Sequence, residues 1–134
     1  MRKIKSALIS VSDKSNLKPL LQTLKKNNIK LISSGGTFKA IKKLKFKCLE
    51  VSNFTGSNEI LDGRVKTLHP KVFGGILNRQ EVVEDQKALA EFEIPQIDLV
   101  IVDLYPFEDT VAAGRSESEI VEKIDIGGIA LIRA

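Results

Sequence analysis

The chain has 134 residues, which is long enough for a single domain with a buried core. Its composition, 43% hydrophobic and 28% charged, is typical of a soluble globular protein, and no apolar run is long enough to span a membrane. The single cysteine, Cys48, cannot form an internal disulfide. We therefore expect a cytoplasmic protein without a membrane partner, in which Cys48 is a buried packing residue.

The net charge of +4 is unevenly distributed along the chain. Residues 1–50 contain 13 Lys or Arg and 2 Asp or Glu, a net charge of +11, whereas residues 51–134 contain 8 and 15, a net charge of −7. Such asymmetry makes nucleic-acid binding one hypothesis. However, the lysine pairs at 25–26 and 42–43 fall on the polar sides of amphipathic helices, and no aromatic residues alternate with them to stack on bases. A solvated helical surface is the better interpretation, and we expect no nucleic-acid partner.

The first half of the chain alternates between two apolar patterns. Short apolar runs at residues 7–11, 29–33 and 46–51 are typical of buried strands. Leu17, Leu20, Leu21 and Leu24 have the spacing of an amphipathic helix, and residues 38–44 form a second helical segment. This order of strand, helix, strand, helix and strand predicts an α/β fold with a parallel sheet.

Two polar loops, at residues 10–14 and 34–37, each follow a strand and open a helix. Backbone N–H groups at the start of a helix are unpaired and carry a partial positive charge, and glycines let the main chain approach an anion closely. A glycine pair alone usually makes only a turn. Two such loops at the carboxyl ends of neighbouring strands predict a phosphate site, to which Lys14 would add a full charge.

The stretch at residues 62–70 has the highest density of functional groups in the chain. Within nine residues it carries a carboxylate, a guanidinium, an ammonium, a hydroxyl and an imidazole, and it follows neither helical nor strand periodicity. It is either a solvated charged turn or a ligand-binding loop. A helical turn is expected at 70–77. His69, at its start, is the only histidine, so we expect it to form a structural hydrogen bond and expect no metal site.

The second half of the chain supplies the remaining elements. Residues 81–93 read as an acidic surface helix, and residues 98–105 as the strongest strand, expected at the centre of the sheet. This strand ends at Pro106, which places Asp103 and Tyr105 on the ligand side, although Tyr105 is equally explained as core filling. Residues 107–113, 117–123 and 129–134 are expected to be helical.

Five motifs in this order resemble one known family: Ser12-Asp13-Lys14, Ser34-Gly35-Gly36-Thr37, Asp62 to Pro70, Leu104-Tyr105-Pro106-Phe107 and Ile124-Asp125-Ile126-Gly127-Gly128. The family is the N-terminal IMP cyclohydrolase domain of bifunctional purine biosynthesis proteins, where it is joined to AICAR transformylase, within the methylglyoxal-synthase-like superfamily. The resemblance covers the whole chain. It implies a three-layer α/β/α fold with a central, mainly parallel sheet, and a cytoplasmic homodimer.

The resemblance also implies a reaction, the last step of de novo purine biosynthesis. 5-Formamidoimidazole-4-carboxamide ribotide closes to inosine monophosphate (IMP) with loss of water and without a cofactor. Lys66 matches the family lysine beside the formyl oxygen, Asp125 the aspartate near the carboxamide, and Tyr105 a hydroxyl donor. A larger set matches positions that hold the purine ribotide: Ser10, Ser12, Asp13, Lys14, Ser34, Gly35, Gly36, Thr37, Arg64, Thr67, Val102, Asp103, Ile126 and Gly127.

The chain departs from the family pattern at three places. Asp103 stands where the family more often has Asn, which could alter contacts to the purine edge, and Phe73 stands where it usually has His. The family pattern also runs past Ala134 into Ala-Ala-Lys-Asn, whose lysine carries protons in catalysis. We therefore expect residues 1–134 to be a cyclohydrolase domain truncated at its C-terminal end, without the transformylase domain that uses 10-formyltetrahydrofolate.

A non-catalytic superfamily domain that binds a nucleotide or phosphorylated effector is the alternative. Such a domain needs the phosphate loops but not Lys66, Tyr105 and Asp125 together. Their joint presence favours the enzyme.

Overall fold

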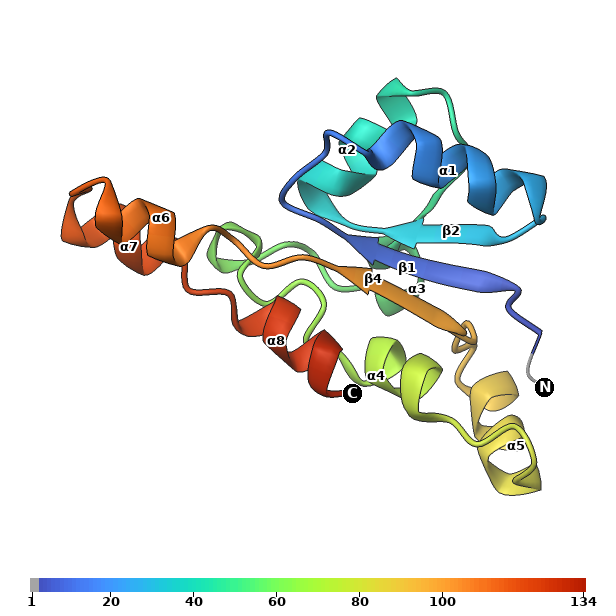
Figure 1. The fold of residues 1–134 in the computed structure, drawn as a ribbon. Coiled ribbons are helices and arrows are strands. Elements are labelled where there is room, and N and C mark those ends of the chain that lie inside the picture. The colour runs from blue at the N-terminus through green and yellow to red at the C-terminus, as the bar shows by residue number, and fades with distance from the viewer. Residues whose placement is uncertain (1–2) are drawn as a thin grey trace.

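The computed structural model describes residues 3–134, in which four strands alternate with helices along the chain (Figure 1). The elements are β1 (Ser6–Ser10), α1 (Leu17–Lys26), β2 (Lys30–Ser33), α2 (Gly35–Lys43), β3 (Leu49–Glu50), α3 (Val51–Thr55), the 3-10 turn η1 (Leu61–Gly63), α4 (Pro70–Leu77), α5 (Val83–Glu91), β4 (Leu99–Val102), α6 (Phe107–Ala112), α7 (Glu117–Glu122) and α8 (Ile126–Arg133).

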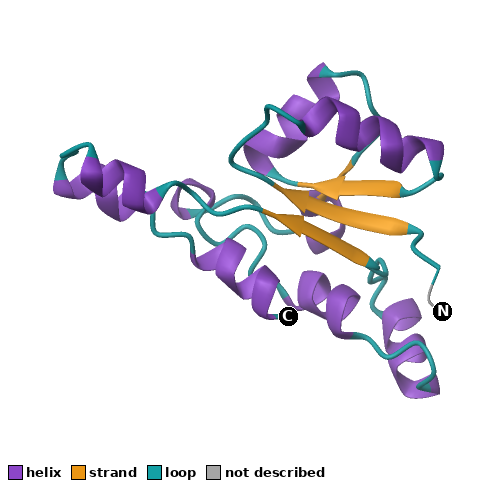
Figure 2. Ribbon diagram, in the orientation of Figure 1, coloured by secondary structure: helices purple, strands orange, loops and turns teal. Residues whose placement is uncertain are grey.

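All strand pairs are parallel, and the strand order is β3-β2-β1-β4. In β1, Ala7 pairs with Leu31 of β2 and with Leu99 of β4, so β1 lies inside the sheet. The helices cover both faces of the sheet: α1 and α2 lie on one side, and α4 and α8 on the other (Figures 1 and 2). This arrangement confirms the predicted α/β/α architecture with a parallel sheet.

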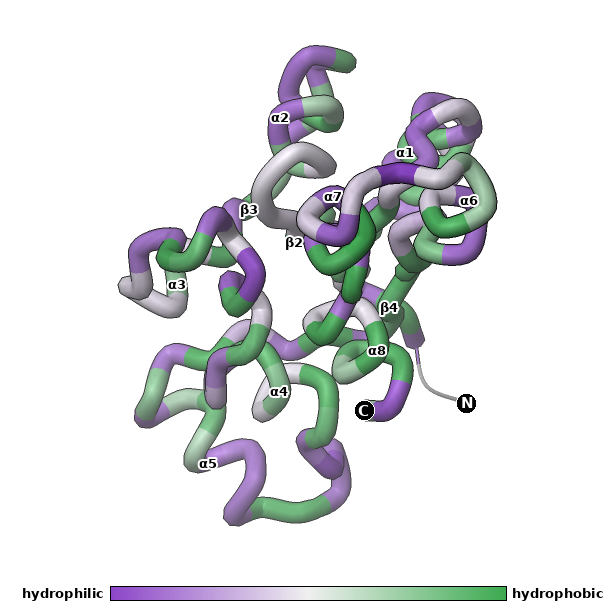
Figure 3. Tube along the Cα trace, turned by 90° about the vertical axis from the view of Figure 1, so that its left-hand side faces the viewer, coloured by the Kyte–Doolittle hydropathy of each residue, from purple (hydrophilic) through white to green (hydrophobic). Residues whose placement is uncertain are grey.

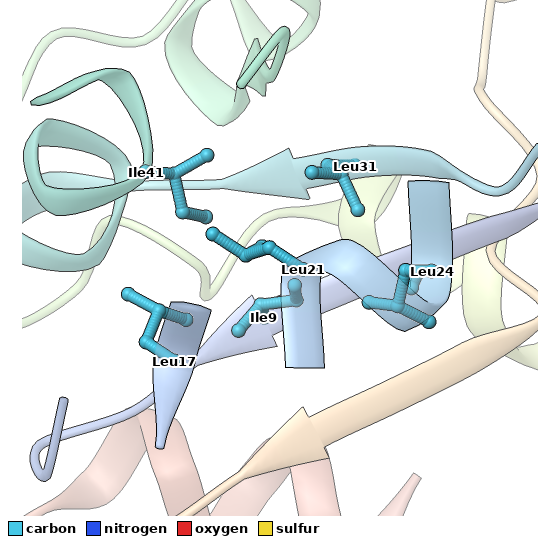
Figure 4. Packing of buried hydrophobic residues seen from close by; sticks show 7 residues of the cluster. Ile9, Leu17, Leu21, Leu24, Leu31 and Ile41 are labelled. Atoms are coloured by element: carbon cyan, nitrogen blue, oxygen red, sulfur yellow. The ribbon is translucent and has the colours of Figure 1, made fainter. Parts of the chain in front are cut away.

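The two faces of the sheet bury two separate apolar clusters, because successive side chains of a strand point to opposite faces. Ala7 and Ile9 of β1 pack with the first cluster, whereas Leu8, between them, packs with the second. In the first cluster, Leu17, Leu21 and Leu24 of α1 lie over the sheet near Ile9, and Leu31 of β2 and Ile41 of α2 complete the group (Figure 4). Fully burying each such side chain typically contributes about 1.5–3 kcal/mol.

The second cluster joins β1 and β2 to the helices of the opposite layer. Its buried members are Leu8, Ile32, Val51, Val72, Ile97 and Leu131, contributed in part by α3, α4 and α8. Figure 3 shows hydrophobic residues along β4 and within α8. Phe73 packs against this cluster, so its role here is to support α4. In the described part of the chain, no helix is both long and apolar enough to cross a lipid bilayer.

The structure corrects two of the predicted strands. Residues 46–51 were expected to form one strand, but only Leu49 and Glu50 pair with β2, and Val51 already begins α3. The chain just before this pair ends α2 instead. Lys45 has a left-handed φ of 63°, and the Phe46 N–H donates to the carbonyl of Ile41 at 3.2 Å. Cys48 is half-buried against the first cluster, and burial raises the pKa of its thiol to about 11.

The strand expected at the centre of the sheet lies instead at its edge. Within residues 3–134, β4 pairs with β1 alone, so the four residues Leu99–Val102 are half-buried rather than buried. An unbroken apolar run is typical of a strand covered on both faces, and this run cannot reveal whether neighbours lie on both edges. The carboxyl end of β4 nevertheless lies next to that of β1, where Asp103 donates its N–H to the carbonyl of Ser10.

Candidate functional site

A cleft lies at the carboxyl ends of β1, β2 and β4, the place where open parallel sheets hold ligands. It is lined by residues from the β1 end, the start of α2, the loop at 62–67, the β4 end and the segment leading into α8: Ser10, Val11, Ser12, Lys14, Ser34, Gly36, Thr37, Asp62, Gly63, Arg64, Lys66, Thr67, Asp103, Tyr105, Glu122, Ile124, Asp125, Ile126, Gly127 and Gly128.

The cleft brings together most of the residues that the motifs singled out. It includes Lys66, Tyr105 and Asp125, and all the expected binding residues except Asp13, Gly35 and Val102. The Asp13 carboxylate instead accepts the Ser15 N–H at 2.8 Å, which lowers the pKa of Asp13. These three residues lie next in sequence to lining residues.

Helix α2 opens directly onto the cleft and supplies an anion-binding end. Its N-cap, Ser34, is buried and extended, and its side chain forms no capping hydrogen bond. The first backbone bond of the helix runs from the Phe38 N–H to the carbonyl of Ser34 at 3.1 Å. The N–H groups of the first turn therefore have no partner within the helix, and they carry its partial positive charge. The residues predicted as a loop thus act as a helix N-terminus.

The hydroxyl of Thr37 is engaged in fixing this helix to the β1 end. It donates to the carbonyl of Val11 at 3.0 Å and accepts the N–H of Val11 at 3.2 Å. The Ser33 hydroxyl makes a similar connection, donating to the carbonyl of Ile9 at 2.7 Å. These bonds hold the carboxyl ends of β1 and β2 in register beside the cleft.

Asp103 fixes the loop that follows β1. Its carboxylate accepts the backbone N–H of Ser12 and, at 3.0 Å, that of Asp13. From the other side, Lys14 Nζ donates to the carbonyls of Val11 and Ser12 at 3.0 and 3.2 Å. Both oxygens of the Asp103 carboxylate therefore bind the backbone of the loop after β1.

The loop at 61–67 brings two cations to the cleft from a constrained backbone. Leu61, Asp62 and Gly63 all have left-handed φ values, of 51°, 53° and 80°. For residues other than glycine this conformation costs roughly 1–2 kcal/mol each, a kind of strain that is concentrated at functional sites. Beyond this turn, the guanidinium of Arg64 forms an ion pair with Glu122 of α7, and both side chains are about half exposed.

The N-terminus of α8 closes the opposite side of the cleft. Asp125 is its N-cap, and its Oδ1 accepts the Gly128 N–H at 2.6 Å. Tyr105 is 43% exposed, and Lys123 Nζ lies 5.4 Å from the centre of its ring. A hydroxyl donor and a carboxylate therefore face the same opening as the cations.

His69 lies outside the lining and has a structural role, as expected. It is the N-cap of α4, and its Nδ1 accepts the Lys71 N–H at 3.1 Å. Among the described residues, no group of three or more His, Cys, Asp or Glu residues is placed to hold a metal ion.

Comparison with protein families gives a match to the MGS-like domain over residues 16–130. The chain belongs to the MGS-like domain family. This membership confirms the resemblance and agrees with the parallel sheet and the cleft at its carboxyl edge.

Relatives with curated descriptions match the chain over nearly its whole length. It is 53% identical over 133 residues to the bifunctional purine biosynthesis protein PurH of Bacteroides thetaiotaomicron, covering 99% of this chain and 26% of that protein. It is 54% identical over 131 residues to PurH of Rhodospirillum rubrum, covering 98% of this chain and 25% of that protein. The chain thus spans about a quarter of the length of these relatives. Among solved structures, the crystal structure of ForH matches with a TM-score of 0.76 and 32% identity, covering 98% of this chain and 67% of that one.

Six lining residues were absent from the predicted set: Val11, Asp62, Gly63, Glu122, Ile124 and Gly128. All but Val11 and Glu122 belong to the motifs quoted above, and Val11 lies between two predicted residues. Glu122 had no such signal, because an exposed glutamate in a short helix gives no indication of a partner 58 positions earlier.

Proposed function

We propose that this chain is an IMP cyclohydrolase domain, which closes 5-formamidoimidazole-4-carboxamide ribotide to IMP with loss of water as part of purine biosynthesis. One observation carries the proposal: Lys66, Tyr105 and Asp125 line the same cleft as the N-terminus of α2. Relatives that are 53% and 54% identical to this chain are named bifunctional purine biosynthesis proteins, which supports the same pathway.

In this proposal, the phosphate of the ribotide binds at the N-terminus of α2. The first-turn N–H groups at Gly35–Thr37 supply donors and a partial positive charge, and Arg64 supplies a full charge from across the cleft. Gripping the phosphate fixes the base, which carries both reacting groups, against the other wall. Orientation of this kind can account for several kcal/mol of a barrier.

Ring closure joins the carboxamide nitrogen to the formyl carbon. The carboxamide nitrogen loses one proton as it attacks, and negative charge develops on the formyl oxygen. The formamide nitrogen then loses a second proton as its double bond to the formyl carbon forms and the C–O bond breaks, and the oxygen leaves with these two protons as water. Lys66 is assigned the developing oxyanion, where its charge stabilises the transition state more than the ground state. Removal of one such donor typically costs ~10²–10³ in rate.

Asp125 and Tyr105 are assigned the proton transfers. Asp125 Oδ1 accepts the Gly128 N–H, which orients the carboxylate and leaves its second oxygen for the carboxamide N–H. The Tyr105 hydroxyl is a donor to the substrate on the exposed side of the cleft. No atom changes oxidation state in the overall reaction, so the proposal includes no redox cofactor.

The test is to incubate the natural full-length protein with the formamido ribotide, to follow IMP by absorbance, and to confirm the product by chromatography. We expect IMP to form, and calorimetry to give an affinity for IMP at least about tenfold higher than for inosine, because a charged hydrogen bond contributes roughly 1.5–3 kcal/mol. Binding of IMP without its formation would instead support the non-catalytic effector-binding domain. Equal affinity for IMP and inosine would remove the phosphate site.

A further inference from the structure

The ammonium of Lys66 lies between two glycines with left-handed backbones. Gly35, the first residue of α2, has a φ of 54°, and a Cβ at this position would overlap Lys66 Nζ. Gly63 has a φ of 80°, and a Cβ there would lie 3.3 Å from the same nitrogen. Both positions favour glycine through their backbone conformation and through the space that the lysine needs. The Lys66 side chain is only 26% exposed in this setting.

Glu59 pairs with the same ammonium from outside the cleft lining. Its Oε1 lies 3.9 Å from Lys66 Nζ, and no other acid of residues 3–134 lies within 4.0 Å of that nitrogen. Glu59 is absent from the cleft lining and lines a small neighbouring pocket instead. Lys66 and Ser34 line both hollows.

The ammonium meets positive charge on the side of α2, although the acids Asp62, Asp103, Glu122 and Asp125 also line the cleft. It lies against the first residue of α2, where the helix carries a partial positive charge, and Arg64 lines the same cleft. Without a counter-charge, the lysine would be favoured in an extended, solvated conformation away from the helix end. The Glu59 carboxylate offsets this repulsion from a position that leaves the cleft face of the ammonium free for a ligand.

We infer that Glu59 is a positioning residue that holds the Lys66 ammonium in its glycine-lined seat, aimed into the cleft. This inference rests on the proposed function, in which Lys66 stabilises the formyl oxyanion. Glu59 touches no substrate and acts through the lysine alone. A displacement of a reacting group by about 1 Å can cost up to ~10²-fold in rate, whereas phosphate binding at α2 and Arg64 does not depend on Glu59.

The experiment compares Glu59→Gln with the wild type and with the control Glu91→Gln in the natural full-length protein. Glu91 lies at the end of α5, outside both hollows, and its substitution removes the same charge. For Glu59→Gln we expect kcat to fall about tenfold, with KM and the Kd for IMP within about twofold of wild type and an unchanged Tm. Glu59→Asp, which restores the charge on a shorter side chain, is expected to recover part of the loss.

A double-mutant cycle separates positioning from other effects. In a Lys66→Ala background, Glu59→Gln should have no further effect on kcat, because the residue through which it acts is gone. An equal loss in both backgrounds, or wild-type turnover in Glu59→Gln, would overturn the inference.

A second readout keeps the inference testable if the wild type forms no IMP, the result that would refute the proposed function itself. Acetic anhydride labels free amines, and mass spectrometry then gives the labelling rate of each lysine. Lys66 should be labelled several-fold faster in Glu59→Gln than in wild type, because it has lost its counter-charge and moves more freely, while Lys71 should be unchanged. An unchanged rate at Lys66 would overturn the inference independently of turnover.

Discussion

At the scale of single residues, polar side chains have two kinds of role in the cleft. Lys66 and Tyr105 present their groups to the opening, whereas Thr37 and Asp103 use theirs to hold the backbone that forms its walls. Sequence motifs cannot separate these two roles, because both use polar residues of the same motifs. Asp103 shows this most clearly, since it lines the cleft and its carboxylate also accepts two N–H groups of the loop after β1.

Asp103→Asn tests this role. An amide offers one neutral oxygen acceptor where the carboxylate offers two charged ones, so one backbone N–H of Ser12 or Asp13 loses its acceptor and the other keeps only a neutral one. We expect a loss of about 1–3 kcal/mol in the free energy of unfolding, measured by urea denaturation. Asp109→Asn, on the exposed surface of α6, is the control and should leave stability unchanged. A stability equal to wild type in Asp103→Asn would show that the carboxylate does not hold this loop.

At the scale of elements, the N-terminus of α2 forms the centre of the cleft, and two neighbouring glycines test its geometry. Gly35 has a positive φ and no room for a Cβ beside Lys66, whereas nothing lies within 4 Å of a Cβ at Gly36, where the backbone is helical. Gly35→Ala should therefore lower stability by about 1–3 kcal/mol, and Gly36→Ala should leave it unchanged or raise it by up to about 1 kcal/mol. The two Tm values give the answer, and equal values would contradict the described start of α2.

Helix α7 is connected to the cleft by the ion pair between Arg64 and Glu122. Exposed pairs of this kind contribute about 0–1 kcal/mol, so a phosphate can displace the carboxylate from the guanidinium. Glu122→Gln should therefore tighten binding of IMP by up to about fivefold, with little change for inosine, as measured by calorimetry. Glu117→Gln, at the other end of α7, is the control. Weaker binding of IMP to Glu122→Gln would mean that this glutamate contacts the ligand favourably.

Much of the fold was predictable because local sequence patterns agree with the helices and strands that form. The leucine stripe of residues 17–24 and the start of α4 at Pro70 lie where periodicity and capping chemistry place them. The failures concern relations between distant segments. Nothing in the run at 98–105 indicates that β4 lies at an edge, and nothing in Glu122 indicates Arg64, because strand order and long-range ion pairs are set by tertiary packing.

At the scale of the whole molecule, stability should fall as acid is added, through carboxyls whose pKa is lowered in the folded state. Hydrogen bonds from Arg79 lower the pKa of Asp85 to about 2, and hydrogen bonds from Ser116 lower that of Glu119. A lowered folded pKa means that the stabilisation is present above the unfolded value and is lost as pH falls through the folded one. The loss therefore begins near the unfolded values of 3.8 for Asp and 4.5 for Glu and continues to about 2.

Asp85→Asn isolates one contribution to this profile. The variant should have a lower Tm than wild type at pH 6, and the difference should shrink to a small remainder as pH falls to about 2, where the wild-type carboxyl is about half protonated. Thermal melts between pH 2 and pH 6 measure it. A difference that stays constant over this range would show that Asp85 acts through packing rather than through its charge.

The proposed function requires one cleft that both binds a phosphate and performs the ring closure. Lys66→Ala tests this most directly, with kcat for IMP formation and the Kd for IMP measured on the same preparation and Lys71→Ala as the control. We predict that kcat falls by about a hundredfold or more while the Kd for IMP changes much less, because the ammonium acts on the charge that develops at the formyl oxygen. A variant that binds IMP much more weakly but retains wild-type kcat would make Lys66 a phosphate contact and contradict the account.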